Sequence, residues 1–195
     1  MSEKPKIVQK RPTKDELIAS AFYFAVKAHE YQVRKGTGLP YIEHPIKVAA
    51  LLMEIKASRD LVVAGFLHDV LEDTDRTADE IYRLFGKKVS LLVESVTENK
   101  SMSWEERKTH TIKSLEKADY DVVVLSLADK LDNIRSIAAD FRQNGERIWL
   151  KFSRPKETQR WYYQELVRVL KKRTKNRAEH LWSGEFADLV SRIFK

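Results

Sequence analysis

The stretch His68-Asp69-Val70-Leu71-Glu72-Asp73-Thr74 follows directly on an apolar run, Leu61 to Leu67. In a helix, His68 and Glu72 would share one face because they are four residues apart. Asp69 and Asp73 have the same spacing and would also share a face. One imidazole and three carboxylates then meet where an apolar helix ends. Partly buried like charges need a counter-charge, and a divalent cation accepts both His nitrogen and carboxylate oxygen. The stretch indicates a metal site, although a His-Asp pair alone also fits a satisfied histidine beside a solvated acidic helix end.

Length and composition are those of one globular domain with a sizeable core. The chain has 195 residues, of which 43% are hydrophobic and 33% charged. It has no cysteine, which excludes disulfides, thiolate ligands and a Cys nucleophile. No apolar stretch approaches the roughly 18 residues of a membrane span, and the first residues lack the apolar core of a secretory signal. We therefore expect a cytoplasmic protein without a membrane partner.

The net charge of +7 is concentrated in the last third of the chain. Residues 138–195 hold 14 Lys and Arg against 7 Asp and Glu, whereas residues 1–137 are balanced. A basic surface suits anionic partners, including phosphate-rich small molecules and nucleic acid. A solvated Lys/Arg-rich helical face explains the same pattern equally simply.

The hydrophobic pattern predicts an all-α fold. Capping boxes at Thr13–Glu16 and Thr77–Glu80 predict helix starts, and Ser103 is suited to cap another helix. The apolar run 122–128 has strand-like composition. We interpret it as helical because apolar residues continue beyond it at spacings of three and four. We expect about eight to ten helices in one domain over residues 13–195. A loose tail at 1–12 precedes it, and there is at most a short β-hairpin near residues 33–42.

Three further positions are candidates for chemistry. Asp129 ends a long apolar run, so it should be partly buried as a metal ligand or a paired charge. Arg34 and Lys35 are adjacent cations in a glycine-containing loop that could grip phosphate, although most such pairs are simply solvated. His44 stands at the start of a predicted helix and matters only if it meets His68 in space.

The ordered set of motifs resembles the HD-domain hydrolases of the RelA/SpoT homologue family. The closest likeness is to the stand-alone small alarmone hydrolases, such as the metazoan SpoT homologues. The likeness is strongest over residues 20–137 and fades beyond. The matching blocks are Ala28-His29-x-x-Gln32-x-Arg34-Lys35, Pro40-Tyr41-Ile42-x-His44-Pro45, Leu67-His68-Asp69-Val70-x-Glu72-Asp73-Thr74, Phe85-Gly86, Val96-Thr97, Glu106-Arg107-Lys108 and Leu127-Ala128-Asp129-Lys130-Leu131-x-Asn133-Ile134-Arg135.

The resemblance implies roles for individual residues. It implies that a divalent cation, typically Mn²⁺ in that family, is bound by four side chains: His44, His68, Asp69 and Asp129. Glu72 and Asp73 match the pair that positions or activates the attacking water. The positions that match residues near the nucleotide and its phosphates are Arg34, Lys35 and Asn133. The sequence leaves Fe²⁺, Co²⁺ and Zn²⁺ open as the native metal.

The chemistry implied is that of the stringent response: hydrolysis of the 3′-pyrophosphate of guanosine 3′,5′-bis(diphosphate) (ppGpp), or of the pentaphosphate, to GDP or GTP and pyrophosphate. The 195 residues leave no room for a synthetase domain, so the resemblance implies a hydrolase only. One alternative is an HD phosphohydrolase acting on adenosine alarmones (ppApp) or NADPH. Another is a non-catalytic nucleotide- or nucleic-acid-binding module. The intact set of ligands and acids argues against that module, so we expect a small-molecule substrate and no nucleic acid. The oligomeric state, including a homo-oligomer, stays open.

Overall fold

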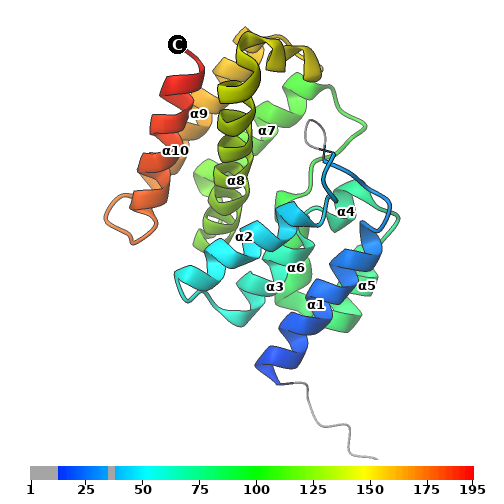
Figure 1. Cartoon of the computed structure of the whole chain (residues 1–195). Coiled ribbons are helices and arrows are strands. Elements are labelled where there is room, and N and C mark those ends of the chain that lie inside the picture. The colour runs from blue at the N-terminus through cyan, green and yellow to red at the C-terminus, as the bar shows by residue number, and fades with distance from the viewer. Residues whose placement is uncertain (1–12, 35–37) are drawn as a thin grey trace, which may run out of the picture.

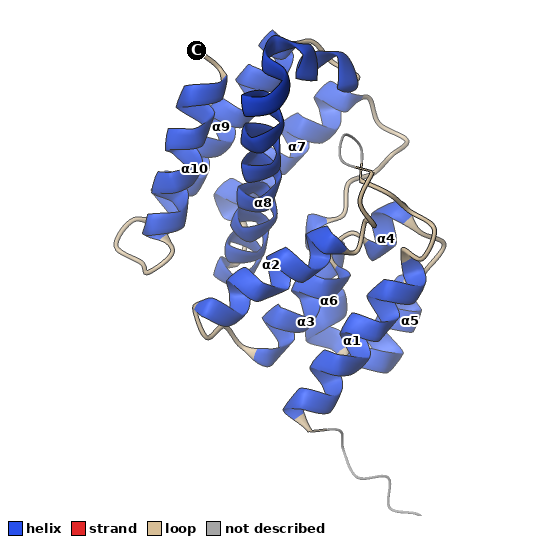
Figure 2. Ribbon diagram, in the orientation of Figure 1, coloured by secondary structure: helices blue, strands red, loops and turns tan. Residues whose placement is uncertain are grey.

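The computed structural model of the chain describes residues 13–34 and 38–195. Within these residues all regular structure is helical, as Figure 2 shows. The prediction of an all-α bundle with about eight to ten helices is confirmed, whereas the predicted tail at 1–12 lies outside the described residues. The elements are α1 (Lys14–Ala28), α2 (Glu43–Glu54), α3 (Arg59–Leu67), α4 (Val70–Asp73), α5 (Ala78–Phe85), α6 (Lys87–Val96), α7 (Trp104–Lys117), α8 (Tyr120–Asn144), the 3-10 helix η1 (Gly145–Lys151), α9 (Lys156–Thr174) and α10 (His180–Ile193).

Helix α8 is the centre of the molecule. It packs against α2, α3 and α6 on one flank and against α9 and α10 on the other (Figure 1). Its first turns, the run with strand-like composition, are buried from Val122 to Asp129 because neighbouring helices cover them on both flanks. The helical interpretation of this run is confirmed. A helix buried all round is expected to be apolar all round, which explains its sequence.

The predicted caps begin the helices as expected. Thr13, Thr77 and Ser103 each accept a hydrogen bond from the backbone N–H three residues later, and the glutamate at that position returns a bond to the cap backbone. Each box satisfies backbone donors that the first helical turn leaves unpaired. The boundaries of α1, α5 and α7 therefore follow from local sequence.

The His68–Thr74 stretch departs from a continuous helix. Helix α3 ends at Leu67, and α4 begins only at Val70. The backbone of Asp69 has φ −95° and ψ −5°, outside regular helix. This break separates His68, which faces the core, from Glu72, which lies on the short helix α4.

The predicted short hairpin near residues 33–42 is reduced to a single antiparallel bridge between Val33 and Pro40. Arg34 donates its backbone N–H to the Leu39 carbonyl at 2.8 Å, and Gly38 has a positive φ of 69°, which favours glycine. The described part of this turn holds Arg34 beside helix α8.

Candidate metal centre and flanking cavities

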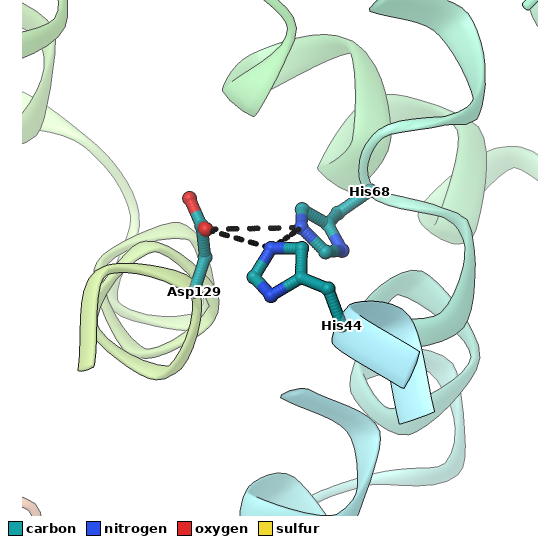
Figure 3. Close-up of side chains that lie close together, drawn as sticks. All are labelled: His44, His68 and Asp129. Carbon is teal, nitrogen blue, oxygen red and sulfur yellow. Dashed lines mark hydrogen bonds and ion pairs between the residues drawn. The ribbon is translucent and has the colours of Figure 1, made fainter. Parts of the chain in front are cut away.

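Three buried side chains from separate helices meet at one point. His44 comes from the first turn of α2, His68 from the end of α3 and Asp129 from α8. Their ligand atoms all lie within 4.8 Å of one another. The two Nε2 atoms are 3.2 Å apart, and Asp129 Oδ1 lies 3.2 Å from His44 Nε2 (Figure 3). Both imidazoles thus turn the same nitrogen toward one carboxylate.

Asp69 adjoins this group. Its Oδ2 lies 3.1 Å from His68 Nε2 and 3.5 Å from His44 Nε2. The hydroxyl of Tyr41 donates to the same oxygen at 2.6 Å, which fixes the carboxylate. The structure therefore brings together all four residues expected to bind metal. Two imidazoles and two carboxylates form an N/O donor set suited to a first-row divalent cation.

The electrostatics of the cluster favour positive charge at its centre. Burial by itself lowers the pKa of His68, but the carboxylates of Asp69 and Asp129 raise it to about 9. Burial by itself raises the pKa of both carboxyl groups, yet the facing imidazoles and, at Asp129, the ammonium of Lys130 hold it below the ordinary range. A divalent cation would supply the same positive charge without protons.

The outer nitrogens of both imidazoles are also held. Asp132, one turn along α8 from Asp129, accepts a hydrogen bond from His44 Nδ1 at 2.7 Å. The carbonyl of Gly65 accepts one from His68 Nδ1 at 2.9 Å. Such outer contacts fix the tautomer and the orientation of ligating histidines. The sequence reasoning missed Asp132, although its spacing of three from Asp129 placed both carboxylates on neighbouring parts of one helix face.

The predicted substrate residues lie at the edge of the cluster. Asn133 donates to Asp129 Oδ1 at 2.6 Å and accepts from Arg34 at 3.1 Å. Arg34 also donates to Ser136 at 2.7 Å and pairs with Asp132 at 2.9 Å. Arg34 is thus bound to α8 beside the candidate metal ligands. Lys35, the third predicted substrate residue, lies outside the described residues.

The two predicted catalytic acids lie on α4 and face a loop formed by residues 97–102. Glu72 accepts a hydrogen bond from the backbone N–H of Glu98 at 3.1 Å. Burial raises the pKa of Glu72. Asp73 pairs with Lys100 at 2.5 Å and accepts from the Tyr41 hydroxyl at 3.3 Å. The acids therefore differ in surroundings, since Glu72 meets a neutral donor and Asp73 meets a cation.

Two cavities flank the cluster. The larger, about 830 Å³, includes Arg34, Asp73 and Asn133 in its lining, together with aromatic side chains of α7 and α9. The smaller, about 610 Å³, lies between α6, α7 and α8 and reaches His68, Asp69 and Asp129. Lys130 lines both cavities. The smaller cavity therefore reaches three of the candidate ligands directly, whereas the larger one is lined by Arg34 and Asn133, which contact His44 and Asp129.

The helical bundle and its buried His/Asp cluster define an HD domain. The family model described as "HD domain" matches residues 21–158, and the chain belongs to this family. Within it, the predicted resemblance to RelA/SpoT homologues is confirmed. A probable guanosine-3′,5′-bis(diphosphate) 3′-pyrophosphohydrolase of Synechocystis is 38% identical over 138 residues, 68% of this chain and 18% of the relative. The Aquifex aeolicus enzyme of that name is 38% identical over 135 residues, 68% of this chain and 19% of the relative. The chain thus spans about a fifth of these curated relatives.

This chain also resembles two solved structures, and the likeness covers nearly the whole length of each of them. Lmo0812 from Listeria monocytogenes has a TM-score of 0.71 and 38% identity, covering 77% of this chain and 98% of that one. A metazoan ortholog of SpoT, described as hydrolysing ppGpp, has a TM-score of 0.77 and 27% identity, covering 94% of this chain and 97% of that one. Among the helices that the structure describes, none is long and apolar enough to span a membrane.

Proposed function

We propose that this chain is a metal-dependent alarmone hydrolase that removes the 3′-pyrophosphate of ppGpp. The observation that carries the proposal is the meeting of His44, His68, Asp69 and Asp129, with Glu72 and Asp73 at one edge. The names of the relatives point to the same reaction. We further propose Mn²⁺ as the ion, a single domain over residues 13–195 and a cytoplasmic location.

The larger cavity suits the nucleoside. Its aromatic lining offers faces on which a purine can stack, and the hydroxyl of Tyr162 is buried there without a hydrogen-bond partner among the described residues. Arg34 and Lys130 lie where this cavity meets the candidate metal ligands, so they would offset phosphate charge. In this arrangement the 3′-pyrophosphate faces Asp129 and the acids of α4.

The reaction requires water to attack the phosphorus attached to the ribose 3′-oxygen. The bond between that phosphorus and the 3′-oxygen breaks, and the 3′-oxygen takes up a proton, giving GDP and pyrophosphate. A bound divalent cation would neutralise charge on the phosphate and lower the pKa of water. Glu72, whose pKa is raised by burial, would accept the proton of the attacking water. Asp73, held by Lys100 and Tyr41, would orient that water.

The test is release of pyrophosphate and GDP from ppGpp with Mn²⁺ and with EDTA. We expect release that depends on Mn²⁺. Asp73→Asn should keep fold and metal but lower kcat by about 10²- to 10⁴-fold. Asp75→Asn changes an exposed carboxylate just beyond the end of α4 and should behave like wild type. Metal-loaded, folded protein that releases no GDP, or Asp73→Asn with near-normal turnover, would contradict the proposal.

A further inference from the structure

The loop of residues 97–102 is attached to helix α7 by one buried carboxylate. Glu98 has a side chain only 9% exposed. It accepts from Arg107 at 2.8 Å, from Lys108 at 2.8 Å and from the hydroxyl of Thr111 at 3.1 Å. Three donors on one helix thus satisfy both oxygens of a single glutamate, and a buried carboxylate paired in this way remains charged.

The same residue touches one of the two candidate catalytic acids, Glu72, through its backbone. The N–H of Glu98 donates to Glu72 Oε2, and Lys100, two residues on, pairs with Asp73 Oδ1. Both contacts that hold the acids of α4 from this side therefore come from one loop. The position of that loop therefore helps to set where the carboxylates of Glu72 and Asp73 lie, together with Tyr41, which also contacts Asp73.

The other hydrogen bonds of this loop are local. Thr97 bonds back to Val93 in α6, and Asn99 accepts from Ser101 within the loop. Among the described residues, Glu98 supplies the side-chain hydrogen bonds that join the loop to α7. Its partner Lys108 lies over the rings of Trp104 and Tyr162, at 5.8 and 5.0 Å from the centroids, and all three line the larger cavity. Glu98 thus links the wall of the substrate cavity to the acids.

A purely structural role explains this arrangement less well. Helix α7 already buries Ile112 and Leu115 in the core, and a buried ion pair is weak evidence of stabilisation because desolvation offsets much of its attraction. The contacts of the buried Glu98 carboxylate with α7 fix the backbone of the same residue, and this backbone donates to Glu72. Positioning of Glu72 therefore explains the buried charge better than packing does. An enzyme gains rate when catalytic groups are held in place before the substrate arrives.

We propose that Glu98 is a positioning residue, whose carboxylate is held by α7 so that its own backbone N–H fixes Glu72 and its loop brings Lys100 to Asp73. This inference rests on the proposed hydrolase function. Glu98 does not touch the reacting atoms and acts through Glu72 and Asp73.

The kinetic test compares Glu98→Ala and Glu98→Gln with wild type. Glu98→Ala should lower kcat by about 10- to 100-fold, the scale of a small misplacement, while KM and metal content stay near wild type. Glu98→Gln keeps the size and one acceptor oxygen, so it should restore part of kcat and should fold even if the alanine variant does not. Glu105→Gln is the matched control, because it loses an exposed ion pair of α7 with Arg154 and should match wild type.

The structural test is amide hydrogen exchange of residues 97–102 in the same variants, which needs no activity. Exchange should be faster in Glu98→Ala and unchanged in Glu105→Gln, with α6 unchanged in both. Unchanged exchange, or a fall in kcat matched by a loss of metal, would overturn the positioning role. If wild type lacks pyrophosphohydrolase activity, the proposed function fails, and the exchange data still decide whether Glu98 anchors the loop.

Discussion

Glu72 is a carboxylate whose surroundings disfavour its charge. Burial raises its pKa from the ordinary 4.5, and the charges of Glu98, Asp69 and Asp73 add to this, against one backbone hydrogen bond that lowers it. A raised carboxyl pKa in the folded state means that folding favours the protonated form. The ionised form of Glu72 therefore reduces stability at neutral pH, which is the expected consequence of a buried candidate base beside the candidate metal centre.

We expect Glu72→Gln to be inactive but more stable. In metal-free protein its Tm at pH 7 should exceed that of wild type, because it lacks a buried charge. The difference should vanish below the ordinary carboxyl pKa of 4.5, where wild-type Glu72 is also neutral. Thermal unfolding at both pH values checks this, and equal Tm at pH 7 would show that the site tolerates the charge without cost. In active wild type, kcat should fall as the pH falls through the raised pKa.

Asp132 belongs to the site although it is not expected to touch the metal. Because it holds Nδ1 of His44, Asp132→Asn should weaken metal affinity by about 10- to 100-fold, the usual effect of losing such an outer contact. Titration with Mn²⁺ measures the loss. The control is Asp121→Asn at the start of α8, which removes an ion pair with Lys88 of α6. If Asp132→Asn bound Mn²⁺ as tightly as wild type does, helix α2 alone would be enough to orient His44.

At the scale of single residues, the sequence predicted the candidate metal ligands but not the residue that holds one of them in place. His44, His68 and Asp129 were found because their residue types have metal chemistry and match a family motif. Asp132 has equally suitable chemistry, but its partner is 88 positions away. A contact between distant segments depends on packing, which local pattern does not determine.

The two helices that carry the histidines are joined by an unusually close contact. A Cβ at Gly65 of α3 would lie 2.7 Å from Leu52 Cδ1 and 3.2 Å from Ala49 Cα of α2. The backbone of α2 cannot yield as a flexible side chain can. The distance between α2 and α3, and with it the spacing of His44 and His68, therefore depends on the absence of a side chain at this position.

Gly65→Ala should separate α2 from α3 and disturb both stability and metal binding. Overpacking of this kind typically costs about 1–3 kcal/mol. Gly184→Ala provides the matched control in α10, because its Cβ would meet nothing within 4 Å, and it should be neutral or stabilising by up to about 1 kcal/mol. Chemical denaturation and metal titration measure both effects. A Gly65→Ala protein as stable as wild type would mean that Leu52 moves aside freely.

Helix starts were predictable because capping boxes act within four residues. The break between α3 and α4 was not, because the composition of His68–Thr74 is compatible with a continuous helix. Tertiary contacts decide it: His68 bonds to Gly65 and faces His44, whereas Glu72 bonds to the distant loop at Glu98. Both sets of contacts form because α3 ends at Leu67 and the separate helix α4 begins at Val70.

Across the whole molecule, the candidate metal joins three parts of the chain. Its ligands come from α2, the α3–α4 junction and α8, so a bound ion would restrain all three at once. A ligand that binds only the folded state adds about 2.7 kcal/mol of stability at a hundred times its Kd. Metal should therefore stabilise the fold as well as the reaction.

We expect EDTA to lower the Tm of wild type and Mn²⁺ to restore it. His68→Ala should contain less metal and lose this response, because one of the converging nitrogens is removed. His180→Ala removes an exposed histidine and should keep the response. Equal metal content in His68→Ala and wild type would remove His68 from the ligand set.

The overall class was predictable from helix periodicity and motif order, but the cavities were not. Their walls combine α6, α7, α8 and α9, and their size depends on how these helices pack. The aromatic lining of the larger cavity comes from two helices, with Trp104 in α7 and Tyr162 and Tyr163 in α9, so it depends on packing that the local sequence pattern does not determine.

The presence of Lys130 in the lining of both cavities bears on inhibitor design. A molecule with a chelating centre and two arms could occupy both cavities, with an anionic group beside this ammonium. Such a compound would add contacts on the α6–α7 side to those of the larger cavity, where we propose that the nucleoside binds. Selectivity between related hydrolases could then be sought in the smaller cavity, away from the shared nucleotide chemistry.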